Sequence, residues 1–172
     1  MSFIVVDVEA DGPIPHKYSM VSFGAVVVEP TLSKTFYGKV KPISNAFIPE
    51  ALAISGHSRT EHESFDDPTL VMTDFKKWIN ENSVGRPIFV SDNVAFDWQW
   101  INYYFHFFIG GNPFGFSGRR IGDMYAGMQN DTFVNWKHLR TTKHDHNPVN
   151  DAIGNAEALL KMKEMGLKIP SK

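Results

Sequence analysis

The chain begins with a short apolar run that ends in two closely spaced carboxylates. Residues 3–6 are Phe-Ile-Val-Val, Asp7 and Glu9 follow, and Asp11-Gly12-Pro13 then predicts a sharp turn. Side chains at positions i and i+2 of a β-strand share a face, so Asp7 and Glu9 are expected side by side at the end of a buried strand. Like charges at that spacing resist joint ionisation, and a divalent cation between them removes the conflict. A strand that surfaces early with two solvated acids is the alternative that these residues leave open.

Composition predicts one globular domain over residues 1–172, with 42% apolar and 21% charged residues. No run approaches the ~20 apolar residues of a membrane span, so no membrane association is expected. The N-terminus lacks the pattern of a secretory signal, and a cytoplasmic location is therefore expected. The absence of cysteine excludes disulfides and thiolate metal sites. A net charge of −2 argues against extensive electrostatic binding to long duplex nucleic acid.

Apolar periodicity predicts a mixed α/β architecture. Three leading strands joined by hairpin-length gaps are expected to be antiparallel, at residues 3–8, 20–29 and 35–41. Asp67-Pro68 predicts the start of a helix that runs to about residue 82, and Asn147-Pro148 predicts the start of a last helix that Gly166 ends. Between them the pattern predicts a strand at 87–90, a helix at 94–108 and a short strand around 119–123.

Two further acidic sites lie where helices are expected to begin. Asp97 follows the strand at 87–90, and Asp151 falls in the first turn of the last helix, with His146 on the flexible segment before it. Each acid taken alone is better explained by the favourable field of a helix N-terminus, and His146 alone by a surface histidine.

Taken together and in order, the three sites resemble the exonuclease motifs of the DEDDh (DnaQ-like) 3′-5′ exonucleases. The matching segments are Asp7-x-Glu9, Asn93-x-x-Phe96-Asp97 and His146-x-x-x-x-Asp151. Each motif alone is weak, but the ordered set spans most of the chain. The resemblance implies a ribonuclease H-like fold, with a mixed five-stranded sheet flanked by helices.

The resemblance also implies a two-metal site. Two Mg²⁺ or Mn²⁺ ions would be held by Asp7, Glu9, Asp97 and Asp151, whose oxygen donors suit these hard cations. Such ion pairs clamp the attacking and leaving oxygens of an in-line displacement. His146 would be the general base, since an imidazole with its ordinary pKa of about 6.5 accepts a proton near neutral pH. His144 is a competing candidate for that role.

Two acids depart from the family pattern without removing a catalytic group. Asp11 could disturb the approach of a phosphate, and Asp145 could tune His146 or face water.

Relatives bind the terminal nucleotide with the backbone after the first motif and with a small-Gly-x loop. By position, the resemblance implies substrate contacts at Ala10, Gly12, Ser55, Gly56, His57, Asn93 and Phe96. For Gly56 a plain turn glycine is an equal alternative.

Two features outside the motifs have plain structural explanations. The aromatic stretch 98–108 is expected to form core and a subunit interface, which makes a homodimer an expectation, although aromatic faces also stack on single-stranded bases. Basic residues gather between Arg119 and His146, either as a solvated face or as a phosphate-facing patch.

These features predict a metal-dependent 3′-5′ exonuclease that releases nucleoside 5′-monophosphates from single-stranded RNA or DNA ends. RNA is slightly favoured, because the chain is small and carries no polymerase or other attached domain. The alternatives are a DNA proofreading or repair exonuclease, and a catalytically silent nucleic-acid-binding module of the same fold.

Overall fold

A computed structural model describes residues 1–170 and contains a five-stranded mixed sheet in the order β3-β2-β1-β4-β5. The strands are β1 (Ser2–Ala10), β2 (Met20–Val27), β3 (Thr35–Lys39), β4 (Pro87–Ser91) and β5 (Gly118–Arg120). The pairs β1–β2 and β2–β3 are antiparallel, whereas β1–β4 and β4–β5 are parallel. This topology confirms the predicted mixed five-stranded sheet.

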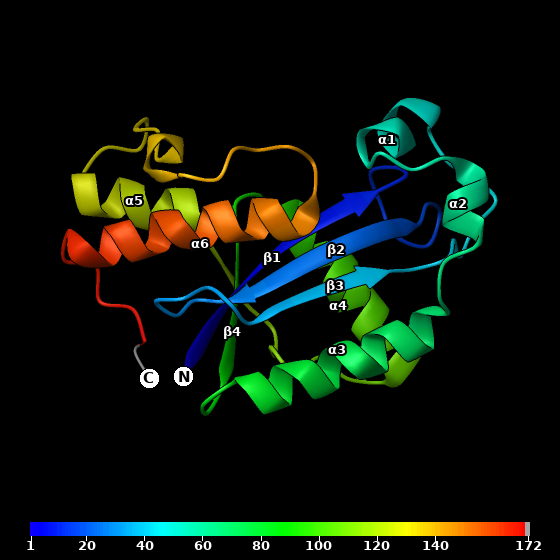
Figure 1. Cartoon of the computed structure of the whole chain (residues 1–172), viewed down its shortest axis with the longest axis horizontal. Coiled ribbons are helices and arrows are strands. Elements are labelled where there is room, and N and C mark those ends of the chain that lie inside the picture. Colours follow the sequence, from blue (N-terminus) through cyan, green and yellow to red (C-terminus); the bar gives the residue numbers. More distant parts are fainter. Residues whose placement is uncertain (171–172) are drawn as a thin grey trace.

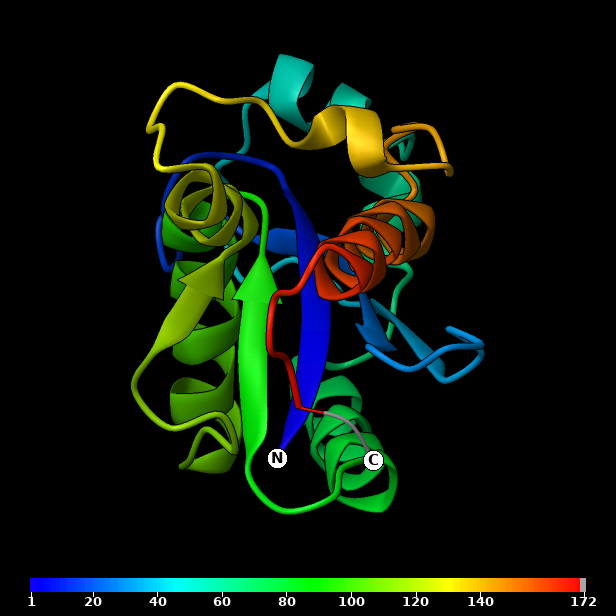
Figure 2. The ribbon, with the colours of Figure 1, turned by 90° about the vertical axis from the view of Figure 1, so that its left-hand side faces the viewer.

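Helices cover both faces of the sheet (Figures 1 and 2). They are α1 (Pro49–Ile54), α2 (Arg59–Glu63), α3 (Pro68–Asn82), α4 (Val94–Ile109), α5 (Ile121–Gln129) and α6 (Pro148–Glu164), with a 3₁₀ turn η1 (Lys137–Leu139). Helices α3 and α4 pack against one face, and α5 and α6 against the other. The short helices α1 and α2 lie beyond the carboxyl end of β1 (Figure 1).

Strand β1 divides two hydrophobic cores. Ile4 and Val6 are fully buried in the core beneath α3 and α4, while Val5 is buried in the core beneath α6. Because side chains alternate along a strand, Asp7 and Glu9 continue the face of Val5. The two acids therefore point toward α6, as the i, i+2 spacing predicted, and they do not sit on a solvated strand end.

Caps and apolar stripes located the long helices correctly. Asp67 accepts a hydrogen bond from the Thr69 amide at the start of α3, and Asn147 accepts from the Val149 amide at the start of α6. The strand expected around 119–123 is only three residues long, because the chain enters α5 at Ile121. Helices α1, α2 and α5 were not predicted from the sequence.

Helix α4 is largely core, as predicted. Four of its side chains are fully buried: Trp100, Ile101, Tyr104 and Phe105. Phe107 stacks on Tyr103 and is 63% exposed, so one side of the helix faces solvent. Association of two copies through this side stays a prediction. Among residues 1–170, no helix combines the length and apolarity needed to cross a membrane.

Candidate active site

Three carboxylates from two distant segments meet on the α6 side of β1. One carboxylate oxygen from each of Asp7, Glu9 and Asp151 lies within 4.8 Å of the others. Asp151 is fully buried in the first turn of α6, and Glu9 is 9% exposed. The sheet register and the helix start thus bring together residues that are 144 positions apart, from 7 to 151.

The absence of a side chain at Gly24 lets α6 approach so closely. Gly24 pairs with Asp7 in the β1–β2 ladder. A Cβ atom built on Gly24 would lie 2.3 Å from the carbonyl carbon and oxygen of Pro148, the first residue of α6. The backbone of the helix start therefore rests directly on the strand beside Asp7, one turn from Asp151.

The fourth carboxylate comes from α4, which packs against the opposite face of the sheet. Strand β4 pairs with β1 only as far as Val5, so the last part of β1 has no strand neighbour on that side. Helix α4 begins three residues after β4 ends, and Asp97 in its first turns accepts a 3.1 Å hydrogen bond from the Val8 amide. Asp97 is 4% exposed and lines the same pocket as Asp7 and Glu9.

Burial and mutual repulsion raise the pKa values of three of these acids. For Asp7 the main cause is burial, followed by the charges of Asp97, Asp151 and Glu9. Burial and the charge of Asp151 raise the pKa of Glu9 to about 7, and burial raises the pKa of Asp97 to about 7. The four acids outnumber the Arg140 guanidinium beside Asp151, and all their ligand atoms are oxygens, so the residues present fit divalent Mg²⁺ or Mn²⁺.

The raised pKa of Glu9 predicts a pH-dependent stability difference between wild type and Glu9→Gln in EDTA. The folded state retains the Glu9 proton up to about pH 7, whereas the unfolded chain loses it near the ordinary value of 4.5. The free energy of unfolding of the wild type therefore falls as pH rises from 4.5 to about 7. The glutamine variant has no titrating group at this position and does not lose stability in this way. We expect Glu9→Gln to melt higher than wild type at about pH 8 and close to it at about pH 4.5. A melting difference that does not change with pH would contradict the assignment.

Asp7, Glu9 and Asp97 line a pocket of about 580 Å³. Four of the predicted substrate contacts line it: Ala10, Gly12, Asn93 and Phe96. One apolar wall comes from α1 and the residue before it, through Ile48, Ala51 and Ile54, which the sequence did not single out.

The structure does not place Ser55, Gly56 or His57 in that wall. The Ser55 hydroxyl donates back to the Leu52 carbonyl at 2.6 Å and ends α1. Gly56 follows with φ of 75° and no atom near a built Cβ, as the turn-glycine alternative predicted. The ring of His57 packs edge-on against Phe65. Helix α1, just before this loop, forms the pocket wall that we expected from the loop. The Ser55 side chain bonds back to the end of that helix and does not line the pocket.

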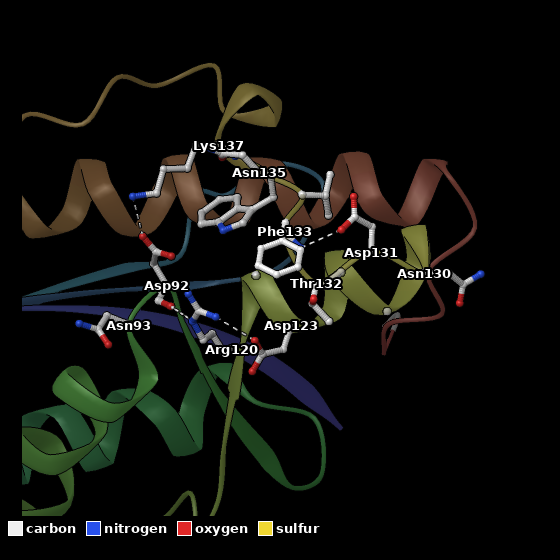
Figure 3. Close-up of a pocket in the computed structure, with 15 residues that line it drawn as sticks. Asp92, Asn93, Arg120, Asp123, Asn130, Asp131, Thr132, Phe133, Asn135 and Lys137 are labelled. Carbon is white, nitrogen blue, oxygen red and sulfur yellow. Dashed lines mark hydrogen bonds and ion pairs between the residues drawn. The ribbon is translucent and has the colours of Figure 1, made fainter.

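A second, larger cavity of about 900 Å³ continues from the pocket (Figure 3). The two cavities share Asp92, Asn93 and Lys137. Lys137 pairs with Asp92 at 3.1 Å, and Arg120 pairs with Asp123 at 2.9 Å. These members of the basic cluster are thus neutralised by acids. Phe133, which lines this cavity, is 95% exposed.

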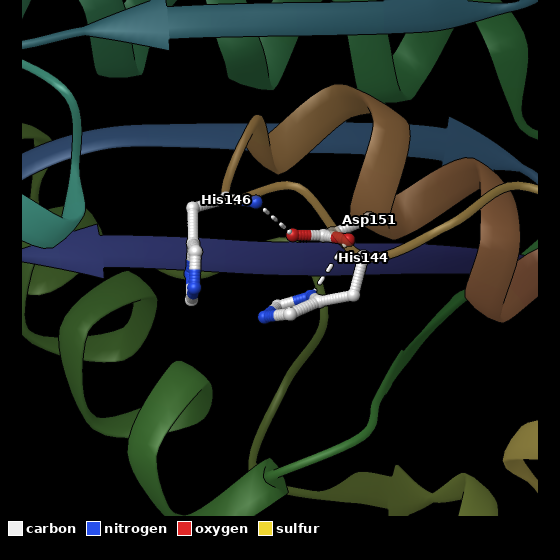
Figure 4. Close-up of side chains that lie close together, drawn as sticks. All are labelled: His144, His146 and Asp151. Carbon is white, nitrogen blue, oxygen red and sulfur yellow. Dashed lines mark hydrogen bonds and ion pairs between the residues drawn. The ribbon is translucent and has the colours of Figure 1, made fainter.

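Asp151 is held by an arginine, a histidine and a backbone amide, and Figure 4 shows its contacts with His144 and His146. Its Oδ1 lies 2.8 Å from Arg140 Nη2 and 2.8 Å from His144 Nδ1, and its Oδ2 accepts from the His146 amide at 3.1 Å. His146 Nδ1 lies 3.7 Å from Glu9 Oε1. Both imidazoles line the pocket, so position alone leaves both as candidate proton acceptors.

Arg140 is a site residue that sequence reasoning did not identify. Its guanidinium occupies the space that a side chain at Gly154 would fill, since a built Cβ there would lie 2.6 Å from Arg140 Nε. Gly154 is one turn after Asp151 on α6. No local pattern in the sequence pairs Arg140 with an acid eleven residues later.

The segment that carries the histidines is anchored at both ends. Glu157 of α6 accepts hydrogen bonds from the amides of Thr141 and Thr142 at 2.8 and 2.7 Å. Asp145 accepts from the Asn147 amide at 3.0 Å and from Asn150 Nδ2 at 2.8 Å. The segment predicted to be flexible is therefore tied to α6, and Asp145 orders the turn into the helix.

Asp11 does not face the pocket, in contrast to the interference suggested from its position. Its side chain is fully buried, accepts from the Ser19 amide and lies 3.2 Å from Arg59 Nη1. Arg59 also donates to the Ser44 carbonyl at 2.8 Å. This ion pair joins the loop after β1 to α2, and through it supports the α1 wall.

Removing the arginine of this pair is expected to destabilise the fold. Arg59→Ala leaves the buried Asp11 carboxylate without its arginine partner, and removing one partner of a buried pair costs about 3–5 kcal/mol. Since the Arg59 side chain is 18% exposed, we expect about 3 kcal/mol in urea unfolding. The matched control is Lys77→Ala, which breaks an exposed pair with Glu81 and should cost less than about 1 kcal/mol. Equal losses in the two variants would refute the structural role of the buried pair.

Comparison with known proteins gives matches in both sequence and structure. A model of the family described as 3′-5′ exoribonuclease Rv2179c-like domain matches residues 2–162. The 3′-5′ DNA exonuclease Cap18 of Escherichia coli is 42% identical over 169 residues, which cover 90% of this chain and 88% of that protein.

Among solved structures, the nuclease domain of 3′hExo, a DEDDh family member bound to rAMP, superposes with a TM-score of 0.78 at 16% identity. The match covers 99% of this chain and 96% of that domain. E. coli exonuclease I in complex with a dT13 oligonucleotide gives a TM-score of 0.69 at 17% identity, over 95% of this chain and 41% of that one. These likenesses confirm the ribonuclease H-like fold predicted from the motifs.

Proposed function

Because this chain belongs to the family of 3′-5′ exoribonuclease Rv2179c-like domains and is a 3′-5′ exonuclease, we propose that it releases nucleoside 5′-monophosphates from the 3′ ends of single-stranded nucleic acid. The proposal depends on one observation: Asp7 and Glu9 lie close to Asp151 and share a pocket with Asp97 and two imidazoles. The DNA relative and the DEDDh fold support the same reaction class.

In this proposal the four carboxylates hold two Mg²⁺ or Mn²⁺ ions. When bound, such ions supply Lewis-acid stabilisation of the charge that develops on the phosphate during attack. The protein's part is to fix the ligands. The Val8 amide orients Asp97, and the Arg140 guanidinium with the His146 amide orients Asp151. Removing an orienting partner of this kind typically weakens metal binding about 10–100-fold.

His146 is the proposed general base, taking a proton from the attacking water. Its side chain is 48% exposed and lies beside Glu9, so water reaches the ring from the pocket. The backbone amide of His146 donates to Asp151, which holds the backbone of this residue beside the carboxylates. A positioned base of this type contributes about 10²–10⁴-fold to rate.

The sugar preference rests on the walls of the pocket. The α1 wall presents Ile48, Ala51 and Ile54, none of which has a polar side-chain atom to bond a 2′-hydroxyl. An apolar wall discriminates a hydroxyl from a hydrogen by no more than about 100-fold. We therefore propose activity on both RNA and DNA. The slight preference for RNA remains a proposal supported by the family description, and the relative named as a DNA exonuclease supports a DNA substrate.

A direct test compares 5′-labelled single-stranded RNA and DNA oligomers of one base sequence, with Mg²⁺ or Mn²⁺. We expect ladders that shorten from the 3′ end, nucleoside 5′-monophosphates as products, and kcat/KM values for the two sugars within about 100-fold. Larger discrimination would mean that a polar group reads the ribose. Tight binding without any released nucleotide would instead identify a silent binding module.

A further inference from the structure

Two histidines and a carboxylate form a compact group at the edge of the proposed catalytic site (Figure 4). One ligand atom from each of His144, His146 and Asp151 lies within 4.8 Å of the others. His144 Nδ1 is 2.8 Å from Asp151 Oδ1, and the two ring centroids are 4.3 Å apart. Glu9 Oε1, 3.7 Å from His146 Nδ1, is available as a fourth donor.

The backbone presents both rings on the same side. His144 and His146 are separated by Asp145, whose carboxylate is used by Asn147 and Asn150 of the turn into α6. The two rings project from the same side of the segment, next to Asp151 (Figure 4). His146 has φ of 60°, a left-handed conformation that is uncommon for a residue other than glycine, and the ties to α6 maintain it.

The donor chemistry of this group differs from that of the four carboxylates. Imidazole nitrogens favour zinc and related first-row transition metals, whereas carboxylate oxygens alone favour Mg²⁺. Ligands about 2.0–2.1 Å from a tetrahedral zinc ion are separated by roughly 3.3 Å, and one ligand atom from each of the three residues already lies within 4.8 Å of the others. We propose that His144, His146 and Asp151 form a transition-metal site that takes Zn²⁺, with Glu9 as the fourth ligand.

This inference extends the proposed function, because it describes regulation of the same site. A Zn²⁺ ion held by His146 uses the lone pair that would accept the proton, and it shares Asp151 and Glu9 with the Mg²⁺ set. Zn²⁺ therefore inhibits turnover in competition with Mg²⁺. Arg140 lies 2.8 Å from Oδ1 of Asp151 and opposes a cation there, whereas Oδ2 accepts from the His146 backbone amide and keeps a second lone pair. The combined negative charge of Asp151 and Glu9 is still larger than the single positive charge of Arg140.

The test titrates Co²⁺, as a spectroscopic substitute for Zn²⁺, into the full chain without added Mg²⁺ or nucleic acid, because Mg²⁺ would compete for Asp151 and Glu9. We expect the visible absorption of four-coordinate Co²⁺ with nitrogen ligands, and its loss when Zn²⁺ is added. His144→Gln should weaken Zn²⁺ binding by at least about 10-fold, since losing a ligand costs no less than losing a partner that orients one. His106→Gln, an exposed histidine on α4 outside both cavities, is the matched control and should bind as wild type does.

The result that overturns the site is equal Zn²⁺ affinity in wild type and His144→Gln, or no nitrogen-ligand absorption in wild type. Because His144 is 53% exposed, the variant should fold, and circular dichroism checks this. His146→Gln provides a second, independent loss of a ligand. In a separate assay, Zn²⁺ should inhibit cleavage by His144→Gln at least about 10-fold less strongly than cleavage by wild type. A chain inactive with every metal would refute the proposed function, while the binding measurement would still decide the zinc site.

Discussion

Asp7→Asn should abolish cleavage while leaving the protein folded. Asp7 is at the centre of the cluster, and the charges of Asp97, Asp151 and Glu9 all raise its pKa. The variant loses a proposed ligand of a site that contributes several kcal/mol to the transition state, and each 1.4 kcal/mol is a tenfold change in rate. We expect kcat/KM to fall at least about 1,000-fold.

The stability of the same variant separates a lost ligand from a lost fold. In EDTA, Asp7→Asn should melt at or above the wild-type temperature, because it removes a half-buried charge that its neighbours repel. Added Mg²⁺ or Mn²⁺ should raise the melting temperature of wild type and have much less effect on the variant. Asp74→Asn, an exposed acid of α3, is the control and should behave as wild type in both measurements. Near-normal turnover in Asp7→Asn would remove the basis for the metal assignment.

His146→Ala should lower kcat about 10²–10⁴-fold, the range for loss of a general base. Binding of Mn²⁺ should persist, because the four carboxylates remain. His146→Asn is a useful companion variant, since asparagine tolerates the φ of 60° at this position and also lacks an imidazole that could accept the proton. Concordant losses in the two variants would exclude backbone strain as their cause.

His144→Ala, measured in parallel, tests which imidazole accepts the proton. Both rings line the pocket, but only His146 matches the motif spacing and neighbours Glu9. We expect the larger loss of kcat in His146→Ala. The reverse order would assign the base to His144.

Much of the fold could be predicted because its longer elements carry strong local signals. Helices α3 and α6 combine a side-chain N-cap, proline at the first position and an apolar stripe. Helices α1 and α2 are six and five residues long, too short for a stripe to be recognisable. The chain turns from β5 into α5 at Ile121 without a side-chain cap, so local sequence indicated a strand there.

The proposed site was predictable where spacing along a strand or at a helix start determines position. That argument placed Asp7 and Glu9 on one face and Asp97 and Asp151 at helix starts. The Arg140–Asp151 pair, the Asp11–Arg59 pair and the α1 wall depend on contacts between segments, which no local pattern encodes. The His144–His146 group was predictable in part. The sequence shows that the two histidines are two residues apart, but it does not show that Glu9 lies close to His146.

The hydrogen atom that serves as the side chain of Gly24 gives a criterion for reading related sequences. Any larger residue at that position would clash with the backbone of Pro148 and displace the beginning of α6 from β2. Such a chain could keep all four acids and still be unable to bring them around one pair of ions. An intact set of motif letters is therefore insufficient to infer turnover in a homologue, and the residue that faces the helix start from the neighbouring strand must be read together with them.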